Sequence, residues 1–333
     1  MTATLECMAP RHLVLAALVA LIWGVNFIAI DLGLRDTPPL LLVALRFTFV
    51  ALPLVFLVPR PAVPWRVLIG IGLAMSAGQF GLLFTAMHLG LPAGIAAVVL
   101  QCQVIFTIAI AAVVLRERPT RLQVAGAGLG LAGLGVVAVG RLQGAGATDA
   151  AGGGAFAVVL PLLVCVAAGL SWAIGNVISR SAAGASGFGI VVWSALVVPI
   201  PMLAVSLLFD GPVVVGQAFA TMGWETVVSV AYTAGLASLV GYSAWNLLLG
   251  RYPAAVVVPI TLLVPPIGLA AGALVLGQVP NPIETAGCAV LVAGVALGQL
   301  HRRRRGPAPV VPGPATGAAE PTDEPLDAVV GRG

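Results

Sequence analysis

The sequence predicts an all-α membrane protein of ten transmembrane helices, arranged as two inverted repeats of five helices. Three observations lead to this fold class: the composition is strongly apolar, the chain divides into ten apolar spans, and its second half repeats its first. Hydrophobic residues make up 60% of the 333 residues and charged residues only 8%, whereas soluble domains have about 25% charged residues. So little charge cannot cover a surface that faces water, and a chain of this kind is expected in a lipid bilayer.

The apolar spans are separated by short segments that carry Gly, Pro or charge. Each span is expected to be helical, because backbone polar groups in hydrocarbon must be satisfied within their own segment. We expect the spans at 13–31, 39–58, 66–86, 92–115, 120–140, 156–178, 187–209, 225–249, 253–276 and 282–300. The first span is too long for a signal-peptide core and lacks a clear cleavage site, so we expect it to be retained.

Prolines interrupt two of these spans. Pro199 and Pro201 fall in the seventh span, and Pro259, Pro265 and Pro266 fall in the ninth. A broken helix frees backbone carbonyls for a binding site or supplies a bend for gating. A static kink is the alternative.

The arginines predict the orientation of the chain. If the N-terminus is cytoplasmic, the inner loops and helix ends hold twelve arginines, and the outer loops hold only Arg35 and Arg141. The positive-inside rule then predicts a multi-pass protein of the cell inner (plasma) membrane with both termini in the cytoplasm. The basic run His301–Arg305 either anchors the last helix or docks on anionic lipid.

An internal repeat relates the two halves of the chain. Leu91–Gly133 aligns with Tyr252–Gly294 at a constant offset of 161 without a gap. Because five spans is an odd number, the two repeats are expected to cross the membrane in opposite orientations. Inverted repeats are typical of transporters that work by alternating access around a site near the midplane. An old duplication that now serves only structure is the alternative.

The repeat and the composition also set the domain boundaries. We expect a first repeat at 1–142, a Gly-rich linker at 143–155, a second repeat at 156–301, and a tail at 302–333. The tail is basic at its start and then rich in Pro, Gly and Ala, which is typical of disorder.

Motifs throughout residues 10–300 carry a family resemblance. They include "WGVNFIAID" (Trp23–Asp31), "LPAGIAAVVLQCQ" (Leu91–Gln103), "RERPTRLQVAG" (Arg116–Gly126) and "LLGRYPAAVVVPITLLVPPIGL" (Leu248–Leu269). These segments resemble the EamA-type family of the drug/metabolite transporter superfamily, and within it the branch that exports O-acetylserine and cysteine. The resemblance implies a secondary transporter that exports small polar metabolites, such as cysteine, O-acetylserine or related amino acids, by alternating access.

One position departs from the family pattern. The family often has Glu at the end of the fourth helix and at the matching position of the second repeat. This chain keeps Glu117, but the matching residue is Gln278. A role for a symmetric pair of carboxylates is therefore not expected.

Two glutamines lie near the middle of the fourth span, where an unpaired amide is costly. Gln101 and Gln103 are separated by about 200° of rotation in an α-helix, so they are not expected to face the same way. One is expected to face a cavity and the other to bond a neighbouring helix, through Gln79 on the third span. Substrate contact and an interhelical hydrogen bond remain alternatives for both.

Arg46 is the one charged residue well inside a span, roughly 10 Å from its outer end at 1.5 Å per residue. A buried arginine by default marks a transport pathway, and its planar fork suits the carboxylate of an amino acid. Two alternatives remain: the side chain extends to the outer interface, or it forms an ion pair, for example with Asp31.

Three pairs of aromatic or amide residues each lie on one face of a helix. Trp23 with Asn26 and Trp172 with Asn176 are spaced by one helical turn. Tyr242 and Trp245 form a similar stripe on the eighth span. We expect these residues to line an amphiphilic substrate cavity, although interface tryptophans and helix-packing amides are the alternative.

Several classes of function are not expected. The four cysteines have no metal-ligand spacing, and Gly128, Gly130 and Gly133 match a dinucleotide motif only inside an apolar span, where its structural context fails. We therefore expect no catalytic residues, no metal and no cofactor. A membrane-embedded lipid enzyme would need a cluster of His, Asp or Glu at one membrane face.

The partners expected are a small-molecule substrate and the lipid bilayer, with no nucleic acid; a homodimer is a further option. Within transport, export of another solute, such as a drug, sugar or nucleobase, is the main alternative. A scaffold or receptor without transport activity is a more distant one.

Overall fold

The computed structural model describes residues 8–144, 150–182, 184–252 and 254–300, and every regular element among them is a helix. The basic run His301–Arg305 and the predicted tail at 302–333 lie outside these residues. The predicted linker at 143–155 is described in part, since one helix ends at Gly144 and the next begins at Ala150.

The first half of the chain forms five helical segments, two of which change their helical type along their length. The third passes from α-helix to π-helix and back, and the fourth contains a single 3₁₀ turn. The elements are α2 (Pro10–Gly33), α3 (Pro39–Val55), α4 (Trp65–Ile71), η1 (Gly72–Gly78, π), α5 (Gln79–His88), α6 (Ala93–Val99), η2 (Leu100–Cys102, 3₁₀), α7 (Gln103–Val114) and α8 (Arg121–Gly144).

The second half follows the same order with one addition. Its elements are α9 (Ala150–Ser179), η3 (Arg180–Ala182, 3₁₀), α10 (Gly187–Ala195), α11 (Pro199–Phe209), α12 (Gly211–Ala220), α13 (Trp224–Val230), η4 (Ala231–Val240, π), α14 (Gly241–Arg251), α15 (Ala254–Val257), η5 (Val258–Leu263, 3₁₀), α16 (Val264–Leu276) and α17 (Pro282–Leu300). The expected proline breaks are present, between α10 and α11 and at η5.

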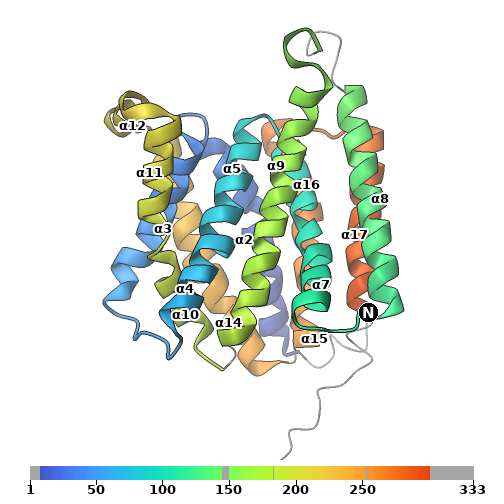
Figure 1. Ribbon diagram of the computed structural model, residues 1–333, viewed down its shortest axis with the longest axis horizontal. Coiled ribbons are helices and arrows are strands. Elements are labelled where there is room, and N and C mark those ends of the chain that lie inside the picture. The colour runs from blue at the N-terminus through green and yellow to red at the C-terminus, as the bar shows by residue number, and fades with distance from the viewer. Residues whose placement is uncertain (1–7, 145–149, 183, 253, 301–333) are drawn as a thin grey trace, which may run out of the picture.

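Helix α12 was not expected from the sequence. It follows a turn at Gly211, whose φ of +85° favours glycine, and Pro212 lies in its first turn, where proline is well tolerated. Figure 1 shows it at one end of the bundle beside α11. Val215 and Ala218 of this short helix pack against Leu41 of α3.

Within the described ranges, eight helices are long and apolar enough to cross a membrane. They span Pro10–Gly33, Trp65–His88, Ala93–Val114, Arg121–Gly144, Phe156–Ala182, Gly187–Phe209, Trp224–Leu249 and Pro282–Gln299. Shorter apolar helices cover Pro39–Val55, Gly211–Ala220 and Ile260–Leu276. Two spans expected from the sequence, 39–58 and 253–276, therefore correspond to shorter helices, one ending at Val55 and one interrupted by η5.

Helix α6 lies at the centre of the core. Each of its seven residues is buried, and all are small or apolar: Ala93–Val99 reads AGIAAVV. Gly94 and Ala97 permit close approach of α16, since a Cβ on Gly94 would lie 2.9 Å from the Leu269 backbone. This buried helix leads directly into Gln101 and places that polar residue deep inside the bundle.

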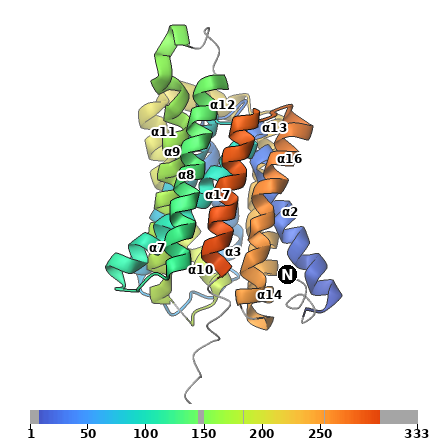
Figure 2. The same ribbon diagram turned by 90° about the vertical axis from the view of Figure 1, so that its right-hand side faces the viewer.

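Helices α8 and α17 form a close antiparallel pair at one edge of the molecule (Figures 1 and 2). A Cβ on Gly126 would lie 2.5 Å from the Gly294 carbonyl oxygen, and one on Gly133 would lie 2.8 Å from the Gly287 carbonyl oxygen. Only glycine permits this backbone contact. Of the glycines that spell the rejected dinucleotide motif, Gly130 and Gly133 therefore serve helix packing, whereas a Cβ on Gly128 would meet nothing within 4 Å.

Candidate functional site

A cavity of about 350 Å³, here called the central cavity, lies between the two halves of the chain. All ten residues proposed from the sequence as substrate contacts line it: Trp23, Asn26, Arg46, Gln79, Gln101, Gln103, Trp172, Asn176, Tyr242 and Trp245. The fold thus brings together side chains from six helical segments of the chain. Its volume is that of a small-ligand pocket.

The sequence reasoning missed nine further lining residues. They are Phe27, Met75, Phe80, Leu83, Ala97, Leu100, Ala237, Thr261 and Val264. Most are apolar residues in apolar spans, so nothing in their type separates them from residues that face lipid. Phe80 follows Gln79 in the chain, and this position is the one sequence feature that could have indicated that Phe80 lines the cavity.

Segments of π-helix and 3₁₀-helix position several of the lining residues. Gln79 directly follows the π segment Gly72–Gly78, and Tyr242 comes just after the π segment Ala231–Val240. Gln101 lies in the 3₁₀ turn Leu100–Cys102. Such local π and 3₁₀ segments within longer helices are frequent at functional sites.

The two π segments are each fixed by a side chain from the other half. Ser171 Oγ donates to the Ala74 carbonyl oxygen at 2.7 Å, and Trp23 Nε1 donates to the Ala237 carbonyl oxygen at 3.0 Å. Carbonyls in a widened turn need partners in a bilayer. These hydrogen bonds supply them and also fix the Trp23 ring against the cavity.

Arg46 is buried against the central cavity, with an exposed fraction of 2%. Its Nη2 donates to Ser238 Oγ at 3.1 Å, and its Cζ lies 3.9 Å from the centre of the Phe80 ring. Both structural alternatives for Arg46 are wrong. The side chain does not extend to the outer interface, and Asp31 forms its ion pair with Arg35, at 3.7 Å.

The guanidinium of Arg46 has unused donor capacity. Its Nε and Nη1 are buried and have no hydrogen-bond partner within the described residues. Each such unsatisfied donor costs about 1–3 kcal/mol, and more when it is charged. No Asp or Glu is among the residues that line this cavity. The site can therefore accept an anionic group that binds the fork in bidentate fashion.

Gln101 and Gln103 both line the central cavity, so the expectation that only one would face it was wrong. The reason is the 3₁₀ turn at Leu100–Cys102. At about 120° per residue, it separates the two side chains less than an α-helix would. Gln103 also makes an interhelical bond, because its Oε1 accepts from Asn176 Nδ2 at 2.9 Å.

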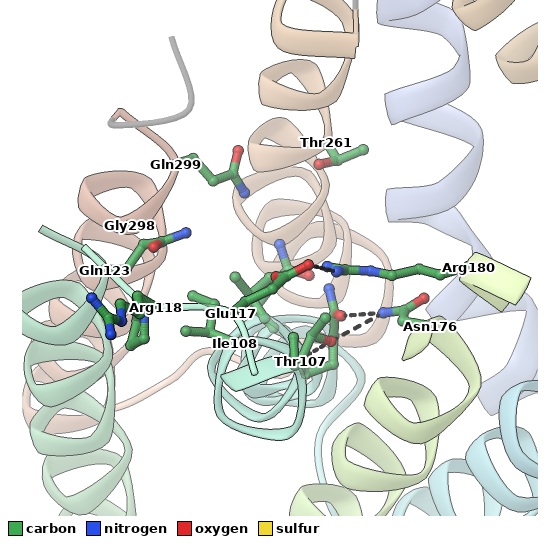
Figure 3. A pocket seen from close by; sticks show the side chains of 15 residues that line it. Thr107, Ile108, Glu117, Arg118, Gln123, Asn176, Arg180, Thr261, Gly298 and Gln299 are labelled. Carbon is green, nitrogen blue, oxygen red and sulfur yellow. Dashed lines mark hydrogen bonds and ion pairs between the residues drawn. The ribbon is translucent and has the colours of Figure 1, made fainter. Parts of the chain in front are cut away.

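A second cavity of about 480 Å³, here called the inner cavity, adjoins the central one. The two share Gln101, Gln103, Asn176 and Thr261 as lining residues. In Figure 3, Asn176 points toward Thr107, and Arg180 points toward Glu117 across the opening. The Gln103–Asn176 hydrogen bond thus lies at the boundary between the two cavities.

Polar contacts link the two halves at the opposite end of the bundle. Gln278 Nε2 donates to Asp31 Oδ1 at 3.3 Å, and Gln278 Oε1 accepts from the Ala93 backbone N–H at 2.8 Å. Thr37 and Thr226 share a hydrogen bond of 2.6 Å. These contacts join the two halves at the end of the bundle that lies away from the inner cavity.

The described residues contain no group of three or more His, Cys, Asp or Glu that could hold a metal ion. Cys102, Cys165 and Cys288 are free and buried in the helix packing. The lining of the central cavity combines amides, aromatic rings and one guanidinium with several aliphatic side chains. That combination can bind a small polar molecule through hydrogen bonds, ring contacts and one charge.

Comparison with known proteins places the chain among transporters. The model of the "EamA-like transporter family" matches residues 11–139 and 159–298. A "Probable amino-acid metabolite efflux pump" of Salmonella typhimurium is 40% identical over 295 residues, which cover 87% of this chain and 95% of the relative. The protein of the same description from Escherichia coli K12 is 37% identical over 302 residues, covering 90% and 98%.

A "Probable terminal-alkyne amino-acid exporter" of Streptantibioticus cattleyicolor is 30% identical over 235 residues, covering 70% of this chain and 71% of the relative. A solved crystal structure with 24% identity matches with a TM-score of 0.58 and covers 89% of this chain and 99% of its own. At that identity the structural likeness shows a shared fold alone.

Proposed function

The chain belongs to the EamA-like transporter family, and from this premise we propose that it exports cysteine, O-acetylserine or related amino acids. A role as a multi-pass membrane exporter of amino-acid-like metabolites agrees with the names of the chain's relatives. The activity is transport and not catalysis. The observation that carries the proposal is the buried Arg46 beside the central cavity, with two nitrogens that have no partner among the described residues.

Arg46 binds the carboxylate of the substrate. A buried charge is costly unless it is paired, and the lining of the central cavity offers no carboxylate of its own. A substrate carboxylate supplies the missing charge and can bind one edge of the guanidinium in bidentate fashion, either Nε with Nη2 or Nη1 with Nη2, since the guanidinium fork matches carboxylate geometry. The substrate therefore completes an ion pair that the lining residues alone do not form.

The glutamines bind the polar body of the substrate. Gln79, Gln101 and Gln103 line the same cavity as Arg46, and each amide can both donate and accept a hydrogen bond. A cavity of about 350 Å³ suits a small metabolite. Cysteine and O-acetylserine combine a carboxylate with a short polar side chain and fit this arrangement.

Transport proceeds by alternating access of two inverted five-helix repeats, 1–142 and 156–301. The glycine contacts between α8 and α17 support this arrangement. The offset of 161 pairs Gly126 with Gly287 and Gly133 with Gly294, and each of these glycines packs on the repeat mate of the other. Reciprocal contacts of this kind in an antiparallel helix pair are those of a pseudo-twofold axis.

Contacts at the two ends of the bundle support the same mechanism. Glu117 pairs with Arg180 at the inner-cavity end, and its repeat mate Gln278 bonds Asp31 at the other end. The offset of 149 that pairs Trp23 with Trp172 also pairs Asp31 with Arg180. The two contacts are therefore symmetry mates, and we assign them as the inner and outer closures of the pathway.

The protein resides in the cell inner membrane with both termini in the cytoplasm. Twelve arginines on the inner side against two on the outer side favour this orientation. It places the inner cavity, with Arg118 and Arg180 at its rim, on the cytoplasmic side. Export then begins from the inner cavity.

The test is counterflow in proteoliposomes loaded with unlabelled cysteine or O-acetylserine. Wild type is expected to accumulate labelled cysteine, whereas Arg46→Ala is expected to lose this uptake. Arg66→Ala is the matched control, because Arg66 is exposed and lines neither cavity. Full counterflow in a folded Arg46→Ala variant would overturn the carboxylate role, and no counterflow in folded wild type would overturn the substrate class.

A further inference from the structure

Asn26 is a buried amide with an unused acceptor. It is 7% exposed, and its Oδ1 has no hydrogen-bond partner within the described chain. The side chain lines the central cavity one helical turn after Trp23. A buried amide oxygen without a partner is costly, so this acceptor is available for a donor on a bound ligand.

The comparable asparagine of the second half is used differently. Asn176 donates from Nδ2 to Gln103 Oε1 at 2.9 Å and to Thr107 Oγ1 at 3.3 Å. It therefore joins α9 to α7. The two asparagines looked alike in the sequence, but Asn176 joins two helices through its nitrogen, whereas the Asn26 oxygen is buried without a partner among the described residues.

Three aromatic rings meet beside Asn26. The centroids of Trp23 and Tyr242 lie 5.5 Å apart, and those of Trp23 and Trp245 lie 5.3 Å apart. The rings are tilted to each other by 55° and 54°, and all three line the central cavity. The negative faces of such rings attract a cation, tryptophan most strongly.

We propose that Trp23, Asn26, Tyr242 and Trp245 form the subsite for the α-ammonium group of the substrate. This inference rests on the proposed function and assigns the second charge of the zwitterion. Arg46 binds the carboxylate, while the Asn26 oxygen accepts from the ammonium and the ring faces attract its charge. The cavity lining contains no Asp or Glu that could take this role.

The consequence is selectivity for a free α-amino acid. A carboxylic acid without the amino group leaves the Asn26 oxygen unpaired, and an amine without the carboxylate leaves Arg46 unpaired. Sites built to hydrogen-bond a group discriminate strongly against analogues that lack it. We therefore expect both partial analogues of cysteine to compete poorly.

The experiment measures competition against labelled-cysteine counterflow under reducing conditions. The competitors are cysteine, 3-mercaptopropionate, which lacks the amine, and cysteamine, which lacks the carboxylate. In wild type, cysteine is expected to compete at least tenfold better than either analogue. In Asn26→Leu, cysteine is expected to lose about tenfold in competition, while 3-mercaptopropionate changes less than twofold.

A gain-of-function variant covers the case in which Asn26→Leu fails to fold. Asn26→Asp places a carboxylate beside the rings, so cysteamine is expected to compete several-fold better than in wild type. A purely structural role for Asn26 would not produce that gain.

The outcomes separate this inference from the proposed function. If wild type transports cysteine but 3-mercaptopropionate competes equally well, the ammonium subsite is overturned and the proposed function stands. If Asn26→Asp leaves cysteamine competition unchanged, the assignment of Asn26 is overturned. If folded wild type shows no cysteine counterflow, both proposals are overturned together.

Discussion

The Arg46 guanidinium lies over the face of the Phe80 ring, with its Cζ 3.9 Å from the ring centre. Phe80 is held in turn by near-perpendicular contact with Phe84, at 6.0 Å between centroids and an interplanar angle of 89°. Phe84 is fully buried. Phe80, the ring on which Arg46 stacks, is therefore itself anchored in the core.

Phe80→Leu is expected to raise the KM for cysteine counterflow about fivefold. The cation–π contact contributes about 1 kcal/mol at a site of this kind, and without it the guanidinium is less well positioned for the carboxylate. Phe49→Leu is the control, because Phe49 is 56% exposed on α3, the same helix as Arg46. A KM that is equal in both variants would contradict the positioning role of Phe80.

Gly133→Ala and Gly135→Ala are expected to have opposite effects on thermal stability. A Cβ on Gly133 would lie 2.8 Å from the Gly287 carbonyl oxygen, whereas one on Gly135 meets nothing within 4 Å. Both changes gain about 1 kcal/mol of helix propensity, but only Gly133→Ala forces α8 and α17 apart. The melting temperature in detergent should fall for Gly133→Ala and hold or rise for Gly135→Ala; equal shifts would refute the packing argument.

Gln278→Glu is expected to shift the protein toward its outward-open state. The carboxylate still accepts from the Ala93 N–H, but it loses the donor to Asp31 and repels that residue instead. Glu117→Gln removes the ion pair with Arg180 and is expected to shift the protein the opposite way.

Labelling with a membrane-impermeant thiol reagent measures this shift. The reporter is Ala237→Cys, at the central cavity, in a background whose four native cysteines are replaced by alanine. Labelling from outside should increase in Gln278→Glu and decrease in Glu117→Gln. The same change in both variants would show that the two contacts are not opposing closures.

Ser171→Ala is expected to destabilise the fold by about 0.6–1.7 kcal/mol, the range of hydrogen bonds between membrane helices. Its Oγ supplies the donor for the Ala74 carbonyl oxygen in the π segment of the third span. Ser181→Ala is the control, since Ser181 is exposed and bonds only the nearby Ile178 carbonyl oxygen. Equal melting temperatures for wild type and Ser171→Ala would contradict this role.

Much of the candidate site could be predicted from residue type. Arg46, Gln79 and Gln101 are polar residues inside apolar spans, where lipid exposure is costly, so they had to face the protein interior. Phe80 and Thr261 could not be found in this way. An apolar ring is equally stable against lipid or against a cavity, and a lone threonine can bond its own helix.

The sequence by itself determined that the chain is a helical membrane protein with a repeat, because apolar spans and their periodicity are local properties of the chain. Only the tertiary structure decided that Gln101 and Gln103 share a cavity, that the Asn176 nitrogen bonds a neighbouring helix, and that the Asn26 oxygen is buried without a partner among the described residues. Those outcomes depend on a 3₁₀ turn and on the register between helices distant in sequence. Hydrogen bonds extend only about 3 Å, so small differences in how helices pack decide which buried polar groups are paired and which remain free for a ligand.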